Sequence, residues 1–440
     1  MYREIIKKLE EWKEKANRKP LLLTGVRQCG KTYIVQEFAS KYFKNTVYVN
    51  FEAEEKLSGI FEYDFDVKRI VSELERSYKT RIVPGETLVF FDEIQVCPRA
   101  ITSLKYFCEN MRKLHVVCAG SLLGVALKRN QVSFPVGKVN RLQLYPMSFK
   151  EFVIANGRED LIESFSDWPI DRVIPDLYKT PMNKLLKEYY IVGGMPEVVK
   201  TWIETRDFEE VETVQKEILS DYADDFAKHA PLEDVPKIRW IWDSVPVQLA
   251  KENNKFIFSH VKEGKRSADL EDALQWLVDA GLLIKSELVE KPETQLDSCA
   301  DKTYFKVYML DIGLLRARSK VSPDIILEGS ENYKRFKGAF AENYVLNELR
   351  SIGKQPFFWR SGNTAEVDFV YEDEGEFIPV EVKAADNTQA KSYKQFCEKY
   401  KPKRGAKLSE KNIAENLCDT TITYSIPLYL GWNLDYYFLR

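Results

Sequence analysis

The chain has 440 residues, too many for one ordinary core, and at about 100 to 200 residues per domain it predicts two to four domains. Hydrophobic residues make up 44% and charged residues 30%, which are globular values that exclude wholesale disorder and a membrane protein. A net charge of −3 gives no general attraction to nucleic acid, so any such binding must come from a local basic patch.

Targeting and redox signals favour a cytoplasmic protein. No apolar run approaches about 18 residues, and the charged start of the chain has the pattern of an amphipathic helix rather than a signal peptide. Seven cysteines are scattered without Cys-x-x-Cys spacing, which argues against a zinc site or a disulfide framework.

Strand and helix patterns alternate in the first third of the chain. Apolar runs at 21–23, 47–51, 88–91 and 116–119 are separated by stretches with helical periodicity. Short apolar strands connected by helices predict a parallel sheet that is buried on both faces, and hence an α/β fold.

The loop after the first strand satisfies the pattern G-x-x-x-x-G-K-[ST] and is followed by a helical stretch. Its glycines would let backbone N–H groups surround phosphate oxygens at the N-terminus of that helix. Lys31 is expected to reach the β- and γ-phosphates of ATP, and the Thr32 hydroxyl to bind Mg²⁺. The predicted nucleotide-binding residues are Gly25, Val26, Arg27, Gln28, Cys29, Gly30, Lys31 and Thr32.

A second part of the same site is predicted where two later strands end. Asp92 and Glu93 follow an apolar strand; Asp92 would hold Mg²⁺, and Glu93 would orient the attacking water. Water as the acceptor argues against a P-loop small-molecule kinase. Ser121 follows the next strand and could sense the γ-phosphate. The simpler alternatives are a solvated acidic strand end and a serine that caps a helix.

Four segments together resemble a known family: Gly25-Val-Arg-Gln-Cys-Gly-Lys-Thr, Phe91-Asp-Glu-Ile-Gln, Ala119-Gly-Ser and Leu144-Tyr-Pro-Met-Ser-Phe-Lys-Glu-Phe. They resemble a bacterial and archaeal family of AAA-type ATPases whose members carry a C-terminal domain of unknown function that looks restriction-endonuclease-like. The resemblance covers nearly the whole chain and implies a P-loop core with the roles given above.

The sequence departs from this family where an arginine finger is expected. Family members have Gly-Arg shortly before the Tyr145-Pro-Met-Ser-Phe stretch, whereas this chain has Gly137-Lys138. Lysine lacks the planar fork that arginine presents to a γ-phosphate. Arg141 is the substitute candidate, with a salt-bridged surface arginine as the alternative.

The middle of the chain is predicted to be helical. A helical pattern over 176–230 is interrupted at Gly193-Gly194-Met195-Pro196, which is either a hinge or a simple helix break. Three helices (237–250, 259–261 and 270–282) and two strands (283–288 and 304–309) then follow the order of a winged-helix module. Acidic residues on the third helix favour protein contact at least as much as insertion into a DNA groove.

The last 110 residues contain the pattern of a PD-(D/E)xK nuclease. Glu342 lies on a predicted helix, Asp368 on a strand, and Glu381 and Lys383 on one face of the next strand. Glu342, Asp368 and Glu381 could bind Mg²⁺ beside a scissile phosphate, and Lys383 could stabilise charge. Cross-strand ion pairs on a solvated face would explain the same residues without chemistry.

Downstream of these residues lies a basic stretch with interleaved aromatic residues. Its lysines and Arg404, between 391 and 407, could follow a nucleic-acid backbone, although a solvated helix face is the simpler interpretation.

The sequence as a whole predicts four parts: an AAA-type core at 1–155, a helical lid or linker at 156–230, a winged-helix-like module at 231–325 and a PD-(D/E)xK-like domain at 326–440. The expected function is that of an ATP-binding, Mg²⁺-dependent ATPase that regulates a nuclease-like, nucleic-acid-binding C-terminal domain. DNA or RNA would be its partner. The alternative is an ATP-driven switch or adaptor, whose inactive nuclease-like domain binds a protein partner or a second copy of the chain.

Overall fold

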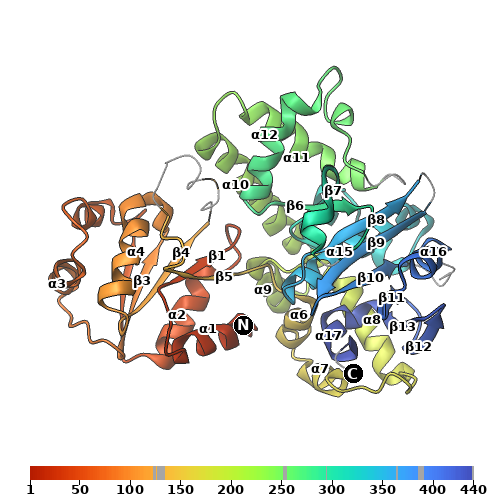
Figure 1. The fold of residues 1–440 in the computed structure, drawn as a ribbon, viewed down its shortest axis with the longest axis horizontal. Helices are drawn as coiled ribbons and strands as arrows, with labels where there is room; N and C mark the ends of the chain where they lie inside the picture. The colour runs from red at the N-terminus through yellow and green to blue at the C-terminus, as the bar shows by residue number, and fades with distance from the viewer. Residues whose placement is uncertain are drawn as a thin grey trace. The chain divides into compact units, whose positions relative to one another are not determined.

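The computed structural model describes residues 1–121, 125, 134–250, 255–293, 295–362, 365–384 and 391–438. The chain divides into two compact units, one made of Met1–Tyr145 with Asp279–Gly281, the other of Pro146–Val278 with Leu282–Arg440. Figure 1 labels the helices and strands along the chain. None of the helices within these ranges is long and apolar enough to cross a membrane.

The N-terminal unit is built on one parallel sheet. Within the described residues five strands form it, in the order β2-β3-β4-β1-β5, with every pairing parallel. The strands are β1 (Leu21–Thr24), β2 (Asn45–Asn50), β3 (Thr87–Asp92), β4 (His115–Gly120) and β5 (Asn140–Gln143). The helices are α1 (Ile5–Glu14), α2 (Lys31–Tyr42), α3 (Val67–Tyr78) and α4 (Pro98–Asn110), with 3-10 segments at Glu55–Phe61 and Ile94–Val96. The predicted parallel α/β core is confirmed.

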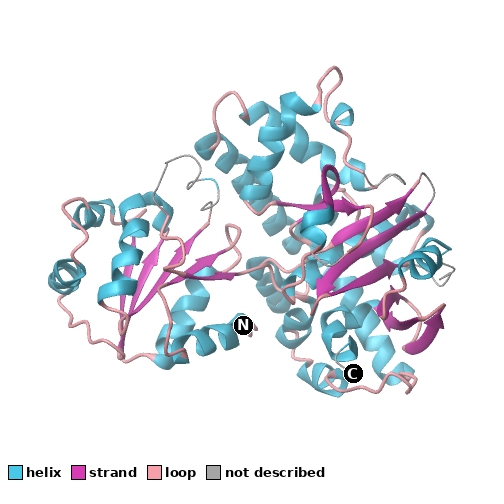
Figure 2. Ribbon diagram, in the orientation of Figure 1, coloured by secondary structure: helices cyan, strands magenta, loops and turns pink. Residues whose placement is uncertain are grey.

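Strand alternation explains how this sheet is covered on both faces. Val89 and Phe91 of β3 point into a core with Ile70 of α3 and Leu104 of α4. On the other face α2 packs against β2, β3 and β4, and Figure 2 shows helices on both sides of these strands. The carboxyl ends of β1, β3 and β4 therefore meet at one edge, where ligands of α/β sheets bind.

The C-terminal unit begins with helices. In chain order they are α6 (Phe149–Ala155), α7 (Glu159–Phe165), α8 (Asp176–Val192), α9 (Pro196–Thr205), α10 (Phe208–His229), α11 (Val235–Leu249) and α12 (Ser267–Asp279). Later helices are α13 (Ile312–Arg318), α14 (Pro323–Glu328), α15 (Glu331–Ser351), α16 (Lys391–Tyr400) and α17 (Leu434–Phe438), with 3-10 segments at Phe258–His260, Leu296–Cys299 and Leu428–Asn433. The expected helical middle is confirmed.

Eight strands of the described segments form one mixed sheet in this unit, in the order β12-β13-β11-β10-β9-β8-β6-β7. They are β6 (Leu283–Val289), β7 (Ala300–Met309), β8 (Phe357–Ser361), β9 (Ala365–Asp373), β10 (Glu376–Val382), β11 (Arg404–Ser409), β12 (Ala414–Cys418) and β13 (Thr421–Pro427). The strands expected to form the wing, β6 and β7, pair with each other and continue this sheet through β8. The expected wing and the expected nuclease-like strands thus share one sheet.

Candidate functional site

The loop between β1 and α2 has the backbone geometry that phosphate binding requires. Gly30 has φ +91° and is the N-cap of α2, so the helix begins directly at Lys31. At Gly25 an added Cβ would lie 2.5 Å from the carbonyl oxygen of Leu144, which leaves room only for glycine. The loop is therefore a tight turn whose N–H groups and helix N-terminus favour an anion.

Lys31 lies inside this turn rather than in solvent. Its side chain is buried, and Nζ donates to the carbonyl oxygens of Gly25 (3.0 Å) and Val26 (2.8 Å). The ammonium group is thus held at the concave side of the loop, where a phosphate would be cradled.

Arg3 stabilises the loop through hydrogen bonds to backbone carbonyl groups. The sequence pattern did not predict this role. Its guanidinium is buried and donates to the carbonyl oxygens of Cys29 (3.1 Å) and Tyr145 (2.6 Å). An arginine at the start of an amphipathic helix reads as a solvent-facing residue, so no local signal could have assigned this role.

Thr32 and Asp92 meet as a magnesium site would require. The Thr32 hydroxyl donates to Asp92 Oδ2 at 2.7 Å, and the Tyr48 hydroxyl donates to the same oxygen at 3.1 Å. Burial raises the pKa of Asp92, the Thr32 hydrogen bond lowers it, and neighbouring Glu93 raises it. A hydroxyl and one carboxylate suit Mg²⁺ that also binds phosphates and water.

Glu93 and Ser121 are brought together by the adjacent ends of β3 and β4. Glu93 has φ +48°, an uncommon conformation for a residue with a side chain. Its Oε2 accepts hydrogen bonds from the Gln95 amide and, at 3.3 Å, from the Ser121 hydroxyl. Unusual backbone geometry held by such bonds is characteristic of functional sites.

The two finger candidates make other contacts. Lys138 forms an ion pair with Glu109 at 2.8 Å. Arg141 lies in β5 opposite Leu22, with its guanidinium 4.4 Å from the ring centroid of Phe134. Neither contact involves the loop residues, so a finger role for Arg141 stays a prediction.

The C-terminal sheet places all four predicted nuclease-like residues in one cluster. Lys383 Nζ lies 2.7 Å from Glu381 Oε1, and Asp368 accepts the backbone N–H of Val382 at 2.7 Å. Glu342, on α15, accepts a hydrogen bond from the Tyr308 hydroxyl at 3.1 Å.

Lys306 of β7 is a further member of this cluster. It is 1% exposed, and its Nζ lies 2.5 Å from Glu366 and 3.7 Å from Glu342. Burial alone would lower the pKa of Lys306, but the facing Tyr308, Glu342, Glu366 and Asp368 raise it above its ordinary value. The signal in the sequence was a lysine flanked by the apolar and aromatic residues Phe305, Val307 and Tyr308.

Burial and the lysines act in opposite directions on the pKa values of Glu342 and Glu381. Burial raises the pKa of Glu342 to about 7, with Lys306 opposing and Asp368 reinforcing that shift. Burial and then Asp368 raise the pKa of Glu381 to about 8. Within the described ranges no three His, Cys, Asp or Glu side chains are placed to hold a metal ion. A Mg²⁺ site at Glu342, Asp368 and Glu381 stays a prediction.

The aromatic residues of the basic stretch lie in the core rather than on a binding face. Tyr393 and Phe396 of α16 are fully buried with Trp359. Lys403 pairs with Glu376, and the Tyr400 hydroxyl donates to the Glu290 carbonyl oxygen. Tyr393 and Phe396 are therefore not available to stack on bases, and Tyr400 is partly buried against the same core.

The distinctive Tyr145-Pro-Met-Ser-Phe stretch has a structural role. Met147 N–H donates to the Gly194 carbonyl oxygen at 2.6 Å, and Ser148 forms a capping box with Glu151 at the start of α6. Gly194 N–H in turn donates to Asp311 at 2.6 Å. The Gly193–Gly194 segment is thus a close crossing of three chain segments.

Three segments of the chain match models of known protein families. Residues 17–153 match the model of an AAA domain, residues 183–325 a domain of unknown function (DUF8612), and residues 337–429 another (DUF4143). The chain therefore carries an AAA domain of the P-loop class followed by two domains of unknown function. The nuclease-like character of the last one stays a prediction.

Individual relatives are distant. The uncharacterized protein MJ1544 of Methanocaldococcus jannaschii is 25% identical over 377 residues, which cover 82% of this chain and 74% of that protein. The Walker-type ATPase PABY2304 of Pyrococcus abyssi is 16% identical, with a TM-score of 0.44 over 72% of this chain and 94% of that one. The Aeropyrum pernix ORC1 protein, solved in complex with DNA, is also 16% identical, with a TM-score of 0.30 over 73% and 93%.

Proposed function

We propose that this protein binds ATP with Mg²⁺ and hydrolyses it at the edge of the N-terminal sheet. The observation that carries the proposal is the Thr32–Asp92 hydrogen bond of 2.7 Å, which joins the phosphate loop to the acidic end of β3. Mg²⁺ bound there would neutralise charge on the β- and γ-phosphates.

The remaining residues have separate roles in the in-line displacement at the γ-phosphate. The glycine loop and Lys31 bind the phosphates, and Glu93 orients the attacking water and accepts its proton. Ser121 would contact the γ-phosphate, and its hydrogen bond of 3.3 Å to Glu93 supports a link between that contact and the base. The nucleotide state would thereby alter the Glu93–Ser121 contact.

Nucleotide binding is tested with Lys31→Ala. The variant should lose at least about 100-fold in affinity for Mg²⁺-ATP, because a buried charge-assisted contact to phosphate is removed. Lys44→Ala is the matched control, since Lys44 is exposed and its ion pair within the described ranges is with Glu86 at 2.9 Å. Unchanged affinity in Lys31→Ala, measured by calorimetry, would contradict the proposed site.

For the C-terminal unit we propose a binding role that the ATP cycle switches, rather than cleavage of nucleic acid. The support is charge pairing: Lys383 with Glu381 at 2.7 Å and Lys306 with Glu366 at 2.5 Å. Lysines that already neutralise the carboxylates leave less negative charge to attract a divalent cation.

One assay separates this role from the nuclease hypothesis. Purified protein is incubated with single- and double-stranded DNA and RNA, ATP, and Mg²⁺ or Mn²⁺, and compared with Asp368→Ala and Lys383→Ala. We expect no cleavage by any of the three proteins. Cleavage by the wild type that both variants lose would overturn the binding role and establish a nuclease.

A further inference from the structure

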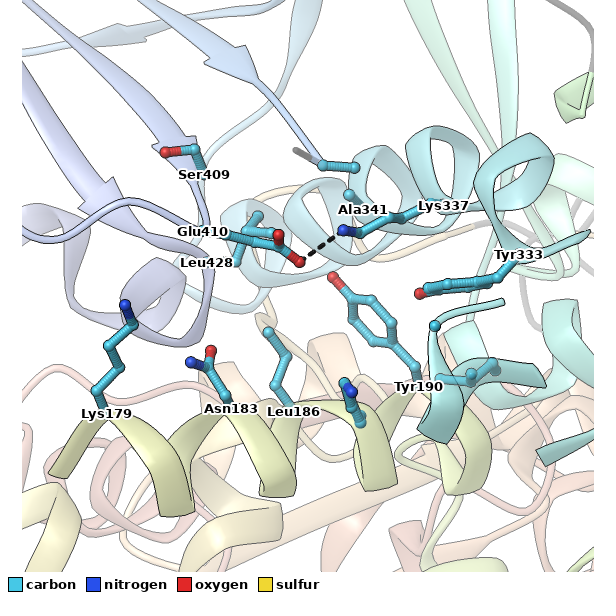
Figure 3. A pocket seen from close by; sticks show the side chains of 14 residues that line it. Lys179, Asn183, Leu186, Tyr190, Tyr333, Lys337, Ala341, Ser409, Glu410 and Leu428 are labelled. Carbon is cyan, nitrogen blue, oxygen red and sulfur yellow. Dashed lines mark ion pairs between the residues drawn. The ribbon is translucent and has the colours of Figure 1, made fainter. Parts of the chain in front are cut away.

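A cavity of about 460 Å³ lies within the C-terminal unit, and none of the four predicted nuclease-like residues is among its lining residues. Figure 3 shows Lys179, Asn183 and Tyr190 rising from α8 on one side, with Tyr333 and Lys337 of α15 facing them. Pockets that bind small organic ligands have volumes of about 300 to 1,000 Å³, so this one suits a molecule larger than a single ion.

The cavity lies where three neighbouring parallel strands end. β10 pairs in parallel with β11, and β11 with β13. Their carboxyl ends supply three lining residues: Ala384 just beyond β10, Ser409 at the end of β11, and Leu428 after β13. Crevices at the carboxyl ends of parallel strands are the usual ligand sites of α/β sheets.

Positive charge predominates on the cavity wall. Of its three lysines, Lys337 pairs with Glu410 at 2.7 Å, which cancels both charges. Among the described residues, Lys187 donates to the carbonyl oxygen of Leu327, at 2.8 Å, and to no carboxylate. Lys179 has no carboxylate partner in the part of the chain that the structure describes. Two cations on one face of α8 are therefore left without a counter-charge.

A buried hydroxyl points into the same space. Tyr190 is 5% exposed, its ring packs on Tyr344, and its oxygen has no hydrogen-bond partner among the described residues. Burial raises the pKa of Tyr190 well above its ordinary value, so the group stays a neutral O–H donor. A buried donor without an acceptor costs about 1 to 3 kcal/mol, a cost that a ligand oxygen would remove.

We propose that this cavity binds a phosphate-bearing organic molecule of about nucleotide size. Lys187 and Tyr190 lie one turn apart on α8 and donate to the phosphate, while Lys179, two turns away from Lys187, faces the other end of the ligand. Asn183, between the two lysines, can donate or accept at the polar groups of the organic part. This site is separate from the P-loop and does not depend on ATP hydrolysis.

The test uses the full chain with Lys31→Ala in every sample, so that the P-loop does not contribute to binding. Inorganic phosphate, a nucleoside 5′-monophosphate, a hexose 6-phosphate and the unphosphorylated nucleoside are titrated by calorimetry. We expect saturable binding of at least one of the two organic phosphates and none of the nucleoside. The compound that binds most tightly identifies the organic part of the ligand.

Variants then assign the binding to the cavity. Tyr190→Phe, which removes only the hydroxyl, should weaken binding about tenfold, and the double variant Lys179→Gln/Lys187→Gln by more. Lys200→Gln is the matched control, because Lys200 is exposed on α9 and pairs with Glu204. As a second readout, the ligand should protect Lys179 and Lys187, but not Lys200, from acylation.

Three results would overturn the proposal. The first is that neither organic phosphate binds saturably. The second is that Lys200→Gln loses as much affinity as the cavity variants. The third is that Tyr190→Phe and the lysine variants bind with unchanged affinity. Binding of inorganic phosphate alone would exclude a ligand of nucleotide size.

Discussion

Carboxylates at the ends of strands occur in both sheets, but their partners differ. Asp92 in the N-terminal sheet accepts hydrogen bonds from two hydroxyls, those of Thr32 and Tyr48. In the C-terminal sheet the carboxylates lie against the lysines 306 and 383. Hydroxyl partners stabilise a carboxylate without cancelling its charge, whereas lysines cancel it. The first arrangement can still attract Mg²⁺, and the second already holds its counter-charge.

The strongest test of this contrast removes the buried lysine. Lys306→Met should destabilise the C-terminal unit by about 3 to 5 kcal/mol, because Glu366 and Glu342 lose their buried counter-charge. Urea unfolding followed by tryptophan fluorescence measures it, since Trp12 is the only tryptophan before residue 146.

Lys302→Met on the same strand is the control, because Lys302 is exposed and should change the unfolding midpoint little. If Lys306→Met is as stable as the wild type, the lysine does not neutralise the cluster.

A third kind of partner for a carboxylate is the backbone amide. Its effect on the free energy of unfolding should be smaller and should depend on pH. Asp311 is fully buried and accepts hydrogen bonds from the N–H groups of Gly194 and Leu314. Burial raises the pKa of Asp311 to about 6, while those amide bonds lower it. Since its folded pKa exceeds the unfolded value, its stabilising contribution is complete below about pH 4 and is lost as pH rises to about 6.

The change across that window should reach about 3 kcal/mol. Asp311→Asn should lack this slope, so the stability difference between wild type and variant should shrink as pH increases from 4 to 6.5. Parallel pH profiles of the two proteins would show that Asp311 keeps an ordinary pKa.

The smallest effect concerns the second hydroxyl at Asp92. Tyr48→Phe removes one of two hydrogen bonds to Oδ2, so we expect a loss of about 1 kcal/mol, or roughly fivefold, in affinity for Mg²⁺-ATP. Tyr33→Phe is the control, because the exposed Tyr33 hydroxyl accepts a hydrogen bond from the N-terminal amino group at 3.1 Å, lies near Glu37 and makes no hydrogen bond to Asp92. If both variants lose affinity for Mg²⁺-ATP equally, the Tyr48 hydroxyl makes no specific contribution to the site.

The nucleotide site was predictable because its information is local. Glycines at fixed spacing, an apolar strand before Lys31 and an acidic pair after β3 each have a direct physical reason, and parallel strands bring their ends together. Arg3 was missed because its partners, Cys29 and Tyr145, are carbonyl groups that carry no side-chain signal.

The C-terminal unit was less predictable because its sheet joins distant segments. The pattern near 283–309 fits a wing equally well, and only the pairing of β6 with β8, seen at Leu288 and Phe358, adds it to the larger sheet. Lys306 was not predicted as a member of the cluster for the same reason, since its carboxylate partners lie more than 30 residues later in the sequence. The meaning of Glu381-x-Lys383 depends on such neighbours.

ATP turnover measures the central contrast most directly. Phosphate release from Mg²⁺-ATP is compared in wild type, Glu93→Gln and Asp368→Asn, with ATP binding measured in parallel. Losing the base should slow release by at least about 100-fold in Glu93→Gln while ATP affinity stays within about threefold. Asp368→Asn should hydrolyse at the wild-type rate. Unchanged release in Glu93→Gln, or an equal loss in Asp368→Asn, would contradict the assignment of hydrolysis to the N-terminal sheet edge.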